Sequence, residues 1–357
     1  AALTPNGDLL VVGRSLPDDN TSRAIMGRVP AAGAFSWVRS YDQPNRAGFD
    51  RIVRNPVPQT GTHPYYVLGH QLQALPAVDD VFLMNIDENG DINWKKIYLS
   101  SVDDEFTNVL LAMPNGDLIL GGHRSGEGFI TRANNTGALF NGATPPQPFT
   151  FIDVASAGGA GFYAVGYNFQ QEKVQLISFD VDLFNQWEVT VNGFTAVNNV
   201  FTAAGSIFLG GRKVREACAR MSIGAGGPTL TWVKTLDNGV LTQTASHLSF
   251  LSPAQLAYVD GRTIETGGFG QNCAFMSLSD LELNTCMTEV EDDVFLTSVS
   301  TLYNGPVLPD IEFYDEPMGT DLTGGPRTWQ QATACPDPMN ASIIGVKYKE
   351  CSGLPYS

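Results

Sequence analysis

Residues 114–122 read PNGDLILGG, a turn sequence followed by a short apolar run that ends in glycine. Six runs of this kind occur along the chain, ending at Gly13, Gly69, Gly122, Gly166, Gly211 and Gly261. Short runs rich in β-branched and aromatic residues, bounded by glycine and proline, are typical of strands. A strand that returns at a regular spacing, here about 45 to 57 residues, indicates a repeat protein.

Three further runs accompany each glycine-ended strand in a fixed order. One follows the glycine, as in VFLMNID (81–87), and one precedes the next glycine-ended strand, as in FTNVLLAMP (106–114). Between them lies a segment that usually carries tryptophan, centred on Trp37, Trp94, Phe140, Trp187, Trp232 and Cys286. Four strands per cycle are the pattern of a β-propeller blade, and the tryptophans are expected to pack between blades. We therefore predict an all-β propeller of six four-stranded blades over residues 1–304, with residues 305–357 as a C-terminal appendage.

The two ends of the repeat leave the number of blades open. The first cycle begins at its glycine-ended strand and lacks the strand that should precede it. An extra strand, VFLTSVSTLYN (294–304), follows the sixth tryptophan-position segment, LNTCMTEV (283–290). If this extra strand joins the first cycle, the ring closes with six complete blades. If an upstream strand has instead been cut away, the parent protein holds seven blades or more.

All five cysteines lie in the last 140 residues, at Cys218, Cys273, Cys286, Cys335 and Cys351. A hairpin turn at Ser279-Asp280 would place Cys273 opposite Cys286, at the short Cβ separation that a disulfide requires. Cys335 and Cys351 are the natural second pair, closing the C-terminal tail. Two disulfides predict an oxidising compartment, and with no CxxC pair the cysteine spacing does not predict a zinc site. Cys218 is left over, either buried or available to another chain.

Charge excludes two classes of partner. The net charge is −16, with 37 acidic and 21 basic residues. Nucleic-acid binding and docking on anionic lipid both need clustered lysine and arginine, so neither is expected. No apolar stretch is long enough to span a membrane, and we expect no direct membrane insertion. The chain begins with alanine rather than methionine, which is consistent with a processed or partial secreted protein.

Three stretches of two kinds carry a family resemblance. PNGDLLVVG (5–13) and PNGDLILGG (114–122) resemble repeats of bacterial surface proteins, and DDVFLMNIDENGDINWKKIY (79–98) resembles a repeat common in secreted proteins of Bacteroidota. The resemblance covers residues 5 to about 304 and is best in the first three cycles. It implies a secreted or cell-surface propeller that serves as an adhesion, scaffolding or assembly subunit, with protein partners, and whose repeats encode a fold rather than a catalytic site.

The acidic turn DENGD (87–91) is one candidate for a metal-binding or catalytic site. Its alternating Asp87, Asn89 and Asp91 lack the closing glutamate of a calcium loop, and the spacing does not fit a sialidase Asp-box. Asn89-Gly90 is instead the strongest short signal for a type I′ hairpin turn. No GxSxG elbow and no HExxH-like spacing occur, so we predict no catalytic residue, no metal and no cofactor. The alternative is a carbohydrate-active propeller enzyme or a lectin-like glycan-binding module.

A second candidate site emerges when the six cycles are aligned. The residue directly after the repeat glycine is, in order, Arg14, His70, His123, Tyr167, Arg212 and Arg262. All six side chains can donate hydrogen bonds, and three are guanidiniums suited to carboxylate or sulfate. One hypothesis is that this row binds an anionic glycan or the acidic tail of a protein partner. The other is that the row pairs with loop carboxylates of a neighbouring blade, at Asp50, Asp103, Asp104, Glu105 and Glu291–Asp293.

Overall fold

The computed structural model describes residues 1–15, 23–30, 35–41, 47–57, 63–72, 79–99, 105–124, 127–145, 148–159, 161–213, 216–224, 226–236, 243–252, 255–266, 269–279, 282, 288–290, 293–299 and 312–315. Every regular element among these residues is a β-strand, and every pair of neighbouring strands whose register is defined is antiparallel. The predicted all-β class is therefore confirmed.

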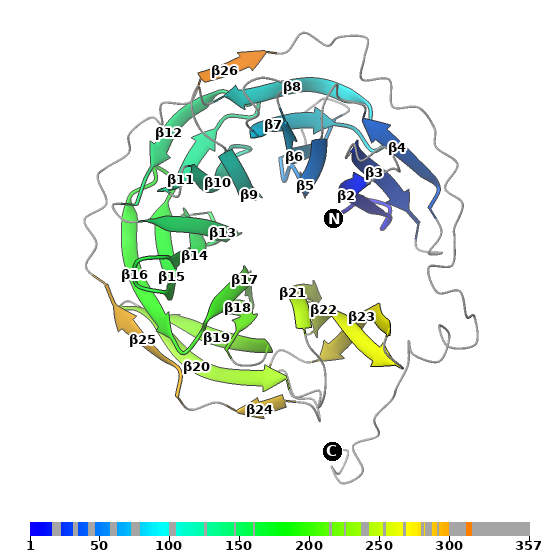
Figure 1. The fold of residues 1–357 in the computed structure, drawn as a ribbon. Helices are drawn as coiled ribbons and strands as arrows, with labels where there is room; N and C mark the ends of the chain where they lie inside the picture. The colour runs from blue at the N-terminus through cyan, green and yellow to red at the C-terminus, as the bar shows by residue number, and fades with distance from the viewer. Residues whose placement is uncertain are drawn as a thin grey trace. The chain divides into compact units, whose positions relative to one another are not determined.

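The strands form six sheets, and Figure 1 shows their order. The first sheet contains β1 (Ala2–Leu3), β2 (Leu9–Ser15), β3 (Arg23–Val29) and β4 (Trp37–Tyr41). The second contains β5 (Ala47–Arg54), β6 (Tyr65–Leu72), β7 (Asp79–Ile86), β8 (Ile92–Leu99) and β26 (Glu312–Asp315). The third contains β9 (Glu105–Ala112), β10 (Leu118–Arg124), β11 (Glu127–Ala133) and β12 (Leu139–Ala143).

The remaining sheets repeat the same meander. The fourth contains β13 (Phe149–Ser156), β14 (Gly161–Asn168), β15 (Lys173–Asp180), β16 (Asn185–Asn192) and β25 (Phe295–Ser298). The fifth contains β17 (Ala196–Ala203), β18 (Ser206–Arg212), β19 (Glu216–Gly224), β20 (Gly227–Leu236) and β24 (Thr288–Val290). The sixth contains β21 (Gln243–Ser252), β22 (Gln255–Thr266) and β23 (Phe269–Ser279). Five antiparallel sheets of four or five strands in a repeated arrangement are consistent with a propeller-like fold.

Contacts divide the chain into two compact units. The first unit holds the first four sheets together with β26, and the second holds the fifth and sixth sheets together with β24. The boundaries fall after Val191 and within β25.

The C-terminal strands correct two predictions about the ends of the repeat. β1 already supplies the first sheet with its own first strand, pairing Ala2 with Leu10, so that sheet lacks nothing. The extra strand predicted at 294–304 does not join the first sheet, because its residues 295–298 form β25 on the outer edge of the fourth. Part of the sixth tryptophan-position segment, Thr288–Val290, pairs with β20 of the fifth sheet rather than with β23.

A common physical reason explains these departures. The last strand of a meander presents a row of unpaired backbone N–H and C=O groups, which any extended segment can satisfy. β24 pairs with β20 in this way through three residues, and β26 pairs with β8 through four. Figure 1 shows β26 on the outer side of β8. Backbone pairing of this kind depends little on side chains, so the sequence gives no signal for which edge each segment chooses.

Hydrophobic cores lie between the first and second, the second and third, and the third and fourth sheets, because inner strands such as β6 bury both of their faces. On β6, Tyr65 and Val67 pack with residues of the first sheet, including Leu10. The alternate residues Tyr66 and Leu68 pack with residues of the third sheet. This period of two is the side-chain alternation of a strand, and it fixes which residue faces which neighbour.

A β-bulge on the first strand accompanies the repeat glycine in every sheet except the first. Five sheets carry one extra residue at this level, namely Asp50, Asn108, Ile152, Asn198 and Thr244. The bulge brings the first strand's backbone against the glycine. A Cβ atom at Gly69 would lie 2.4 Å from the carbonyl oxygen of Gly48. The repeat glycines Gly69, Gly166 and Gly211 are therefore sites of close backbone approach, whereas the sequence alone indicates only strand ends.

The acidic turn 87–91 corrects the predicted turn type. A type I′ turn needs positive φ at both Asn89 and Gly90, but Gly90 alone has it, at 79°. The Asp87 N–H donates to the Asp91 carbonyl at 3.0 Å and the Gly90 N–H to the Asp87 carbonyl at 3.2 Å. The Asp87 carboxylate also accepts from the N–H groups of Asn89 and Asp91, both at 2.8 Å. This is a three-residue loop with its glycine in the left-handed region, so the carboxylate serves the turn.

The fourth sheet keeps this turn without its glycine. Leu183 stands in the glycine position, with φ at 68°, and its side chain is buried in the core between the third and fourth sheets. Left-handed backbone in a leucine costs about 1–2 kcal/mol, and burial of the side chain offsets that cost.

Leu183→Gly should therefore lower the free energy of unfolding by about 1 kcal/mol, because about 2–3 kcal/mol of burial is lost and only part is returned as relieved strain. Urea unfolding measures this difference. A glycine variant more stable than the parent would mean that backbone strain outweighs the packing of Leu183.

Candidate functional site

The six residues that follow the repeat glycines occupy the same register in their sheets. They lie on the second strand of each sheet, opposite Ala24, Val81, Gly128, Val174, Glu216 and Cys273 of the third strand. In the five sheets that have a bulge, the residue of the row directly follows the glycine next to which the first strand bulges. The alignment of Arg14, His70, His123, Tyr167, Arg212 and Arg262 made from sequence is thus an alignment in structure within each sheet.

Arg14 and His70 come together across the first and second sheets. A Cβ atom placed at Gly48 on β5 would lie 3.0 Å from His70 Cε1 and 3.4 Å from the Cβ of Arg14. The His70 Nδ1 lies 2.8 Å from Asp50 Oδ2, and Asp50 is the bulged residue of β5. Arg14 is exposed. His70 thus pairs with a carboxylate of its own sheet, which orients the imidazole, rather than with one of a neighbouring sheet.

The next two members of the row are partly buried. Burial lowers the pKa of His123 below its usual value, which favours the neutral imidazole. The Tyr167 ring packs edge-on against Phe169, with ring centroids 5.4 Å apart. The His123 side chain is therefore a neutral hydrogen-bonding group at neutral pH.

In the second unit Arg212 is exposed, and its carbonyl accepts hydrogen bonds from Thr195 N at 2.7 Å and Thr195 Oγ1 at 3.1 Å. Arg262 is placed by its backbone on β22, opposite Cys273. Among the predicted loop carboxylates, Asp293 bonds Lys213 instead of a member of the row, and this bond lowers the pKa of Asp293. Asp103, Asp104, Glu291 and Asp292 lie outside the described residues, and Glu105 is described by its backbone alone.

Sequence reasoning missed an ion pair between the first strands of the second and fourth sheets. Arg51 Nη1 lies 2.7 Å from Asp153 Oδ1, and Arg51 Nη2 donates to the Ile152 carbonyl at 3.3 Å. The Asp153 carboxylate is buried, with 7% of its side chain exposed. Arg51 and Asp153 each directly follow a bulged residue, so the shared position becomes visible only once the bulges are known.

The tryptophans pack as predicted where the contacts are described. Cβ atoms at Gly90 and Gly137 would lie 3.4 Å from the Trp37 ring and 3.0 Å from the Trp94 ring, each reaching from the preceding sheet. Tyrosines at the ends of the same outer strands add hydrogen bonds. The Tyr41 hydroxyl donates to the Gly90 carbonyl at 2.7 Å, and the Tyr98 hydroxyl does so to Gly137 at 2.8 Å.

The cysteine predictions are tested only in part. Cys218 is a buried free thiol, and burial raises its pKa well above the usual range, so it is an unreactive core residue. Cys273 lies on β23 opposite Arg262, while Cys286, Cys335 and Cys351 lie outside the described residues. The pairs Cys273–Cys286 and Cys335–Cys351 stay predictions.

No protein-family model matches this chain, and no curated protein matches it in sequence. Within the part of the chain that the structure describes, no group of three or more His, Cys, Asp or Glu side chains is arranged to hold a metal ion. The same described residues include no helix of the length and apolar character that a membrane crossing requires.

Proposed function

We propose that this chain is a six-bladed propeller that acts, without catalysis, as a secreted or cell-surface binding subunit in adhesion, scaffolding or assembly. Its ligand presents carboxylate or sulfate groups, carried on a protein partner or on an anionic glycan. The binding positions are those of the row that follows the repeat glycines. The family resemblance of the first three cycles supports the extracytoplasmic setting, and the two expected disulfides agree with it.

One observation carries the proposal: the row keeps its register in all six sheets, and Arg14 and Arg212 are exposed at it. On a chain of net charge −16, exposed guanidiniums at a repeated position are local sites of positive charge. Arginine binds carboxylate and sulfate through two parallel hydrogen bonds, which suits a ligand of that chemistry. The overall acidity limits long-range attraction of polyanions, so contact rather than steering determines binding.

Replacing Arg14, Arg212 and Arg262 together by glutamine should reduce binding to sulfated and carboxylated oligosaccharides, or to glutamate-rich peptides, by at least about tenfold. The melting temperature should stay nearly unchanged, since exposed ion pairs contribute little. Arg54→Gln is the matched control, because Arg54 is an exposed arginine outside the row. The two ligand sets separate a glycan ligand from an acidic protein partner. Unchanged binding to both, or a large fall in melting temperature, would contradict the proposal.

A further inference from the structure

Three arginines occupy the same position on the third strands of the first, third and fifth sheets. They are Arg28, Arg132 and Arg220, and each lies opposite the residue three places before the repeat glycine. Their side chains are 19%, 12% and 20% exposed, so solvent screens their interactions only in part.

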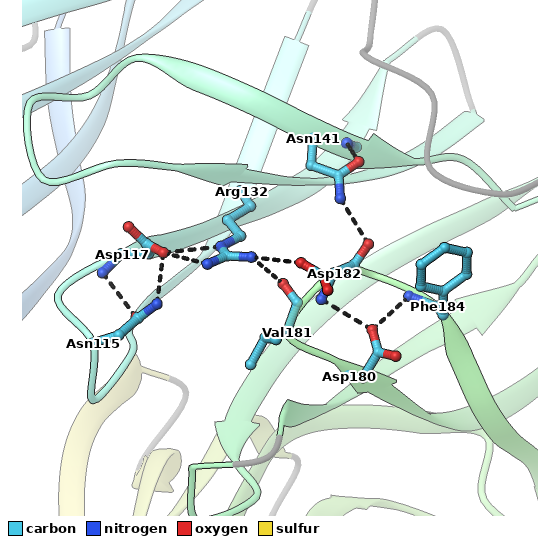
Figure 2. A network of polar contacts seen from close by, with 9 residues as sticks. Asn115, Asp117, Arg132, Asn141, Asp180, Val181, Asp182 and Phe184 are labelled. Carbon is cyan, nitrogen blue, oxygen red and sulfur yellow. Dashed lines mark hydrogen bonds and ion pairs between the residues drawn. The ribbon is translucent and has the colours of Figure 1, made fainter.

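Figure 2 shows the contacts of Arg132. Its Nε and Nη2 donate to Asp117 Oδ2 at 3.0 and 2.5 Å, within the third sheet. Its Nη1 donates to Asp182 Oδ1 at 3.0 Å and to the Val181 carbonyl at 2.7 Å, both in the β15–β16 turn of the fourth sheet. Asn141 on β12 donates to the Asp182 carbonyl at 2.7 Å. One guanidinium therefore joins a turn of its own sheet to the acidic turn of the next.

The other two arginines make the same connection. Arg28 Nη2 lies 2.7 Å from Asp8 in the first sheet, and its Nη1 lies 3.7 Å from Glu88 in the β7–β8 turn of the second. Arg220 Nε donates to Ser206 Oγ at 3.1 Å. Its Nη1 pairs with Glu282, which follows the third strand of the sixth sheet. Asp8, Asp117 and Ser206 all stand five places before the repeat glycine of their sheets.

The even-numbered sheets carry different residues at this cross-strand pair. In the odd sheets the pairs are Leu10–Arg28, Ile119–Arg132 and Phe208–Arg220. In the even sheets they are Tyr66–Asn85, Tyr163–Ser178 and Tyr258–Ser277. Both members of the pair thus alternate with a period of two sheets.

The receiving turns alternate in the opposite sense. The turns after the third strands of the second and fourth sheets contain acidic residues, DENGD (87–91) and DVDLF (180–184), and so does the sequence SDLE (279–282) that follows the third strand of the sixth. The corresponding segments of the odd sheets contain none: PAAGAFS (30–36), NNTG (134–137) and GAGG (224–227). Each sheet that bears the arginine is followed along the chain by a sheet whose segment is acidic. The second and fourth sheets lack the arginine, and each is followed by a sheet whose segment is neutral.

The contact between the second and third sheets uses neutral groups. Asn85 donates its amide to the carbonyls of His63 and Tyr65 in its own sheet, at 2.8 and 3.0 Å. The Tyr66 hydroxyl donates to the Asn135 carbonyl of the next turn at 3.2 Å. At this contact a tyrosine hydroxyl that donates to a backbone carbonyl takes the place of the guanidinium that binds a carboxylate.

We propose that the building block of this protein is a couple of sheets rather than a single sheet, and that Arg28, Arg132 and Arg220 are the residues that specify the partner within each couple. Each odd sheet presents a docking face for an acidic turn, and the following even sheet supplies it. The contact from an odd to an even sheet is charged, and the contact from an even to an odd sheet is neutral. This difference prevents an even sheet from docking in the place of an odd one, and such misassembly between similar repeats is a characteristic failure of repeat proteins. A repeat built from couples contains an even number of sheets.

Hydrogen exchange followed by peptide mass, on the full chain, tests the couple directly. Arg132→Gln should accelerate exchange about tenfold in peptides of the third and fourth sheets and leave β5 to β8 of the second sheet unchanged. Arg28→Gln should do the reverse, accelerating the first and second sheets and sparing the fourth. Arg39→Gln is the matched control, because Arg39 bonds Asp91 at 2.5 Å across the same sheets as Arg28, but its side chain is more exposed, 30% against 19%, and its position does not alternate.

A double-mutant cycle then tests the specific pair. Arg132→Gln and Asp182→Asn should each lower the melting temperature by about 2–4 °C, and Asp182→Asn should lower it by less than half as much in the Arg132→Gln background. Exchange that accelerates in the second sheet as much as in the fourth, or strictly additive shifts in melting temperature, would overturn the proposal.

Discussion

Gly166→Ala is expected to be among the most damaging single substitutions in the first unit, lowering the free energy of unfolding by about 3 kcal/mol or more. An alanine Cβ at Gly166 would lie 2.3 Å from the Thr150 carbonyl oxygen and 2.3 Å from Phe149 Cζ. The carbonyl belongs to the strand that bulges at Ile152, so relief requires the backbone to move. The phenylalanine lies in the core between the third and fourth sheets and cannot move without opening a cavity.

The first sheet provides the control for this prediction. Gly13 occupies the same place in the repeat, but β1 is too short to reach it, and a Cβ at Gly13 would meet nothing within 4 Å. Gly13→Ala should be neutral or stabilise by up to about 1 kcal/mol, through the unfolded state. Urea unfolding and the yield of folded protein measure both variants. Equal effects at Gly13 and Gly166 would show that the bulge is not the reason for the repeat glycine.

The local features of the fold were predictable from sequence because each has a local cause. Alternating apolar residues, a glycine at a constant place and an outer-strand tryptophan together specify a meander and its period. The bulges were not predictable, because the glycine that permits them also reads as a simple strand end. The segments of β24 and β25 were predicted as strands but on the wrong sheets, and β26 was not predicted, because backbone pairing carries no side-chain signature.

The candidate site was predicted as a row and only partly as a set of contacts. The equivalence of Arg14, His70 and their counterparts follows from the repeat, which sequence alignment can detect. The partner of His70 does not follow from the repeat, because Asp50 is the extra residue of a bulge. The alternation of arginine with asparagine and serine on the third strands is present in the sequence too. It can be recognised only when the strand register is known, because the register places these residues at one position beside the turn of the next sheet.

The buried carboxyl of Glu188 should make stability depend on pH in a direction opposite to that of ordinary carboxylates. Glu188 lies on β16 with 4% of its surface exposed, and its carbonyl accepts a hydrogen bond from Val299 N at 3.0 Å. Burial raises the pKa of its side chain from the ordinary 4.5 to about 7. Between these values the folded protein holds a proton that the unfolded chain has released, so stability falls as pH rises through this window.

Glu188→Gln removes this titration and keeps nearly the same shape. At pH 8 the variant should be more stable than the parent by about 1–3 kcal/mol, and at pH 4 the two should be nearly equal. The difference between the two unfolding free energies, measured from pH 4 to 8, isolates Glu188 from the many other carboxylates of a chain with net charge −16. Glu127→Gln, at an exposed position, should give a flat difference. A flat difference for Glu188→Gln as well would mean that its carboxylate is stabilised in the charged form despite its burial.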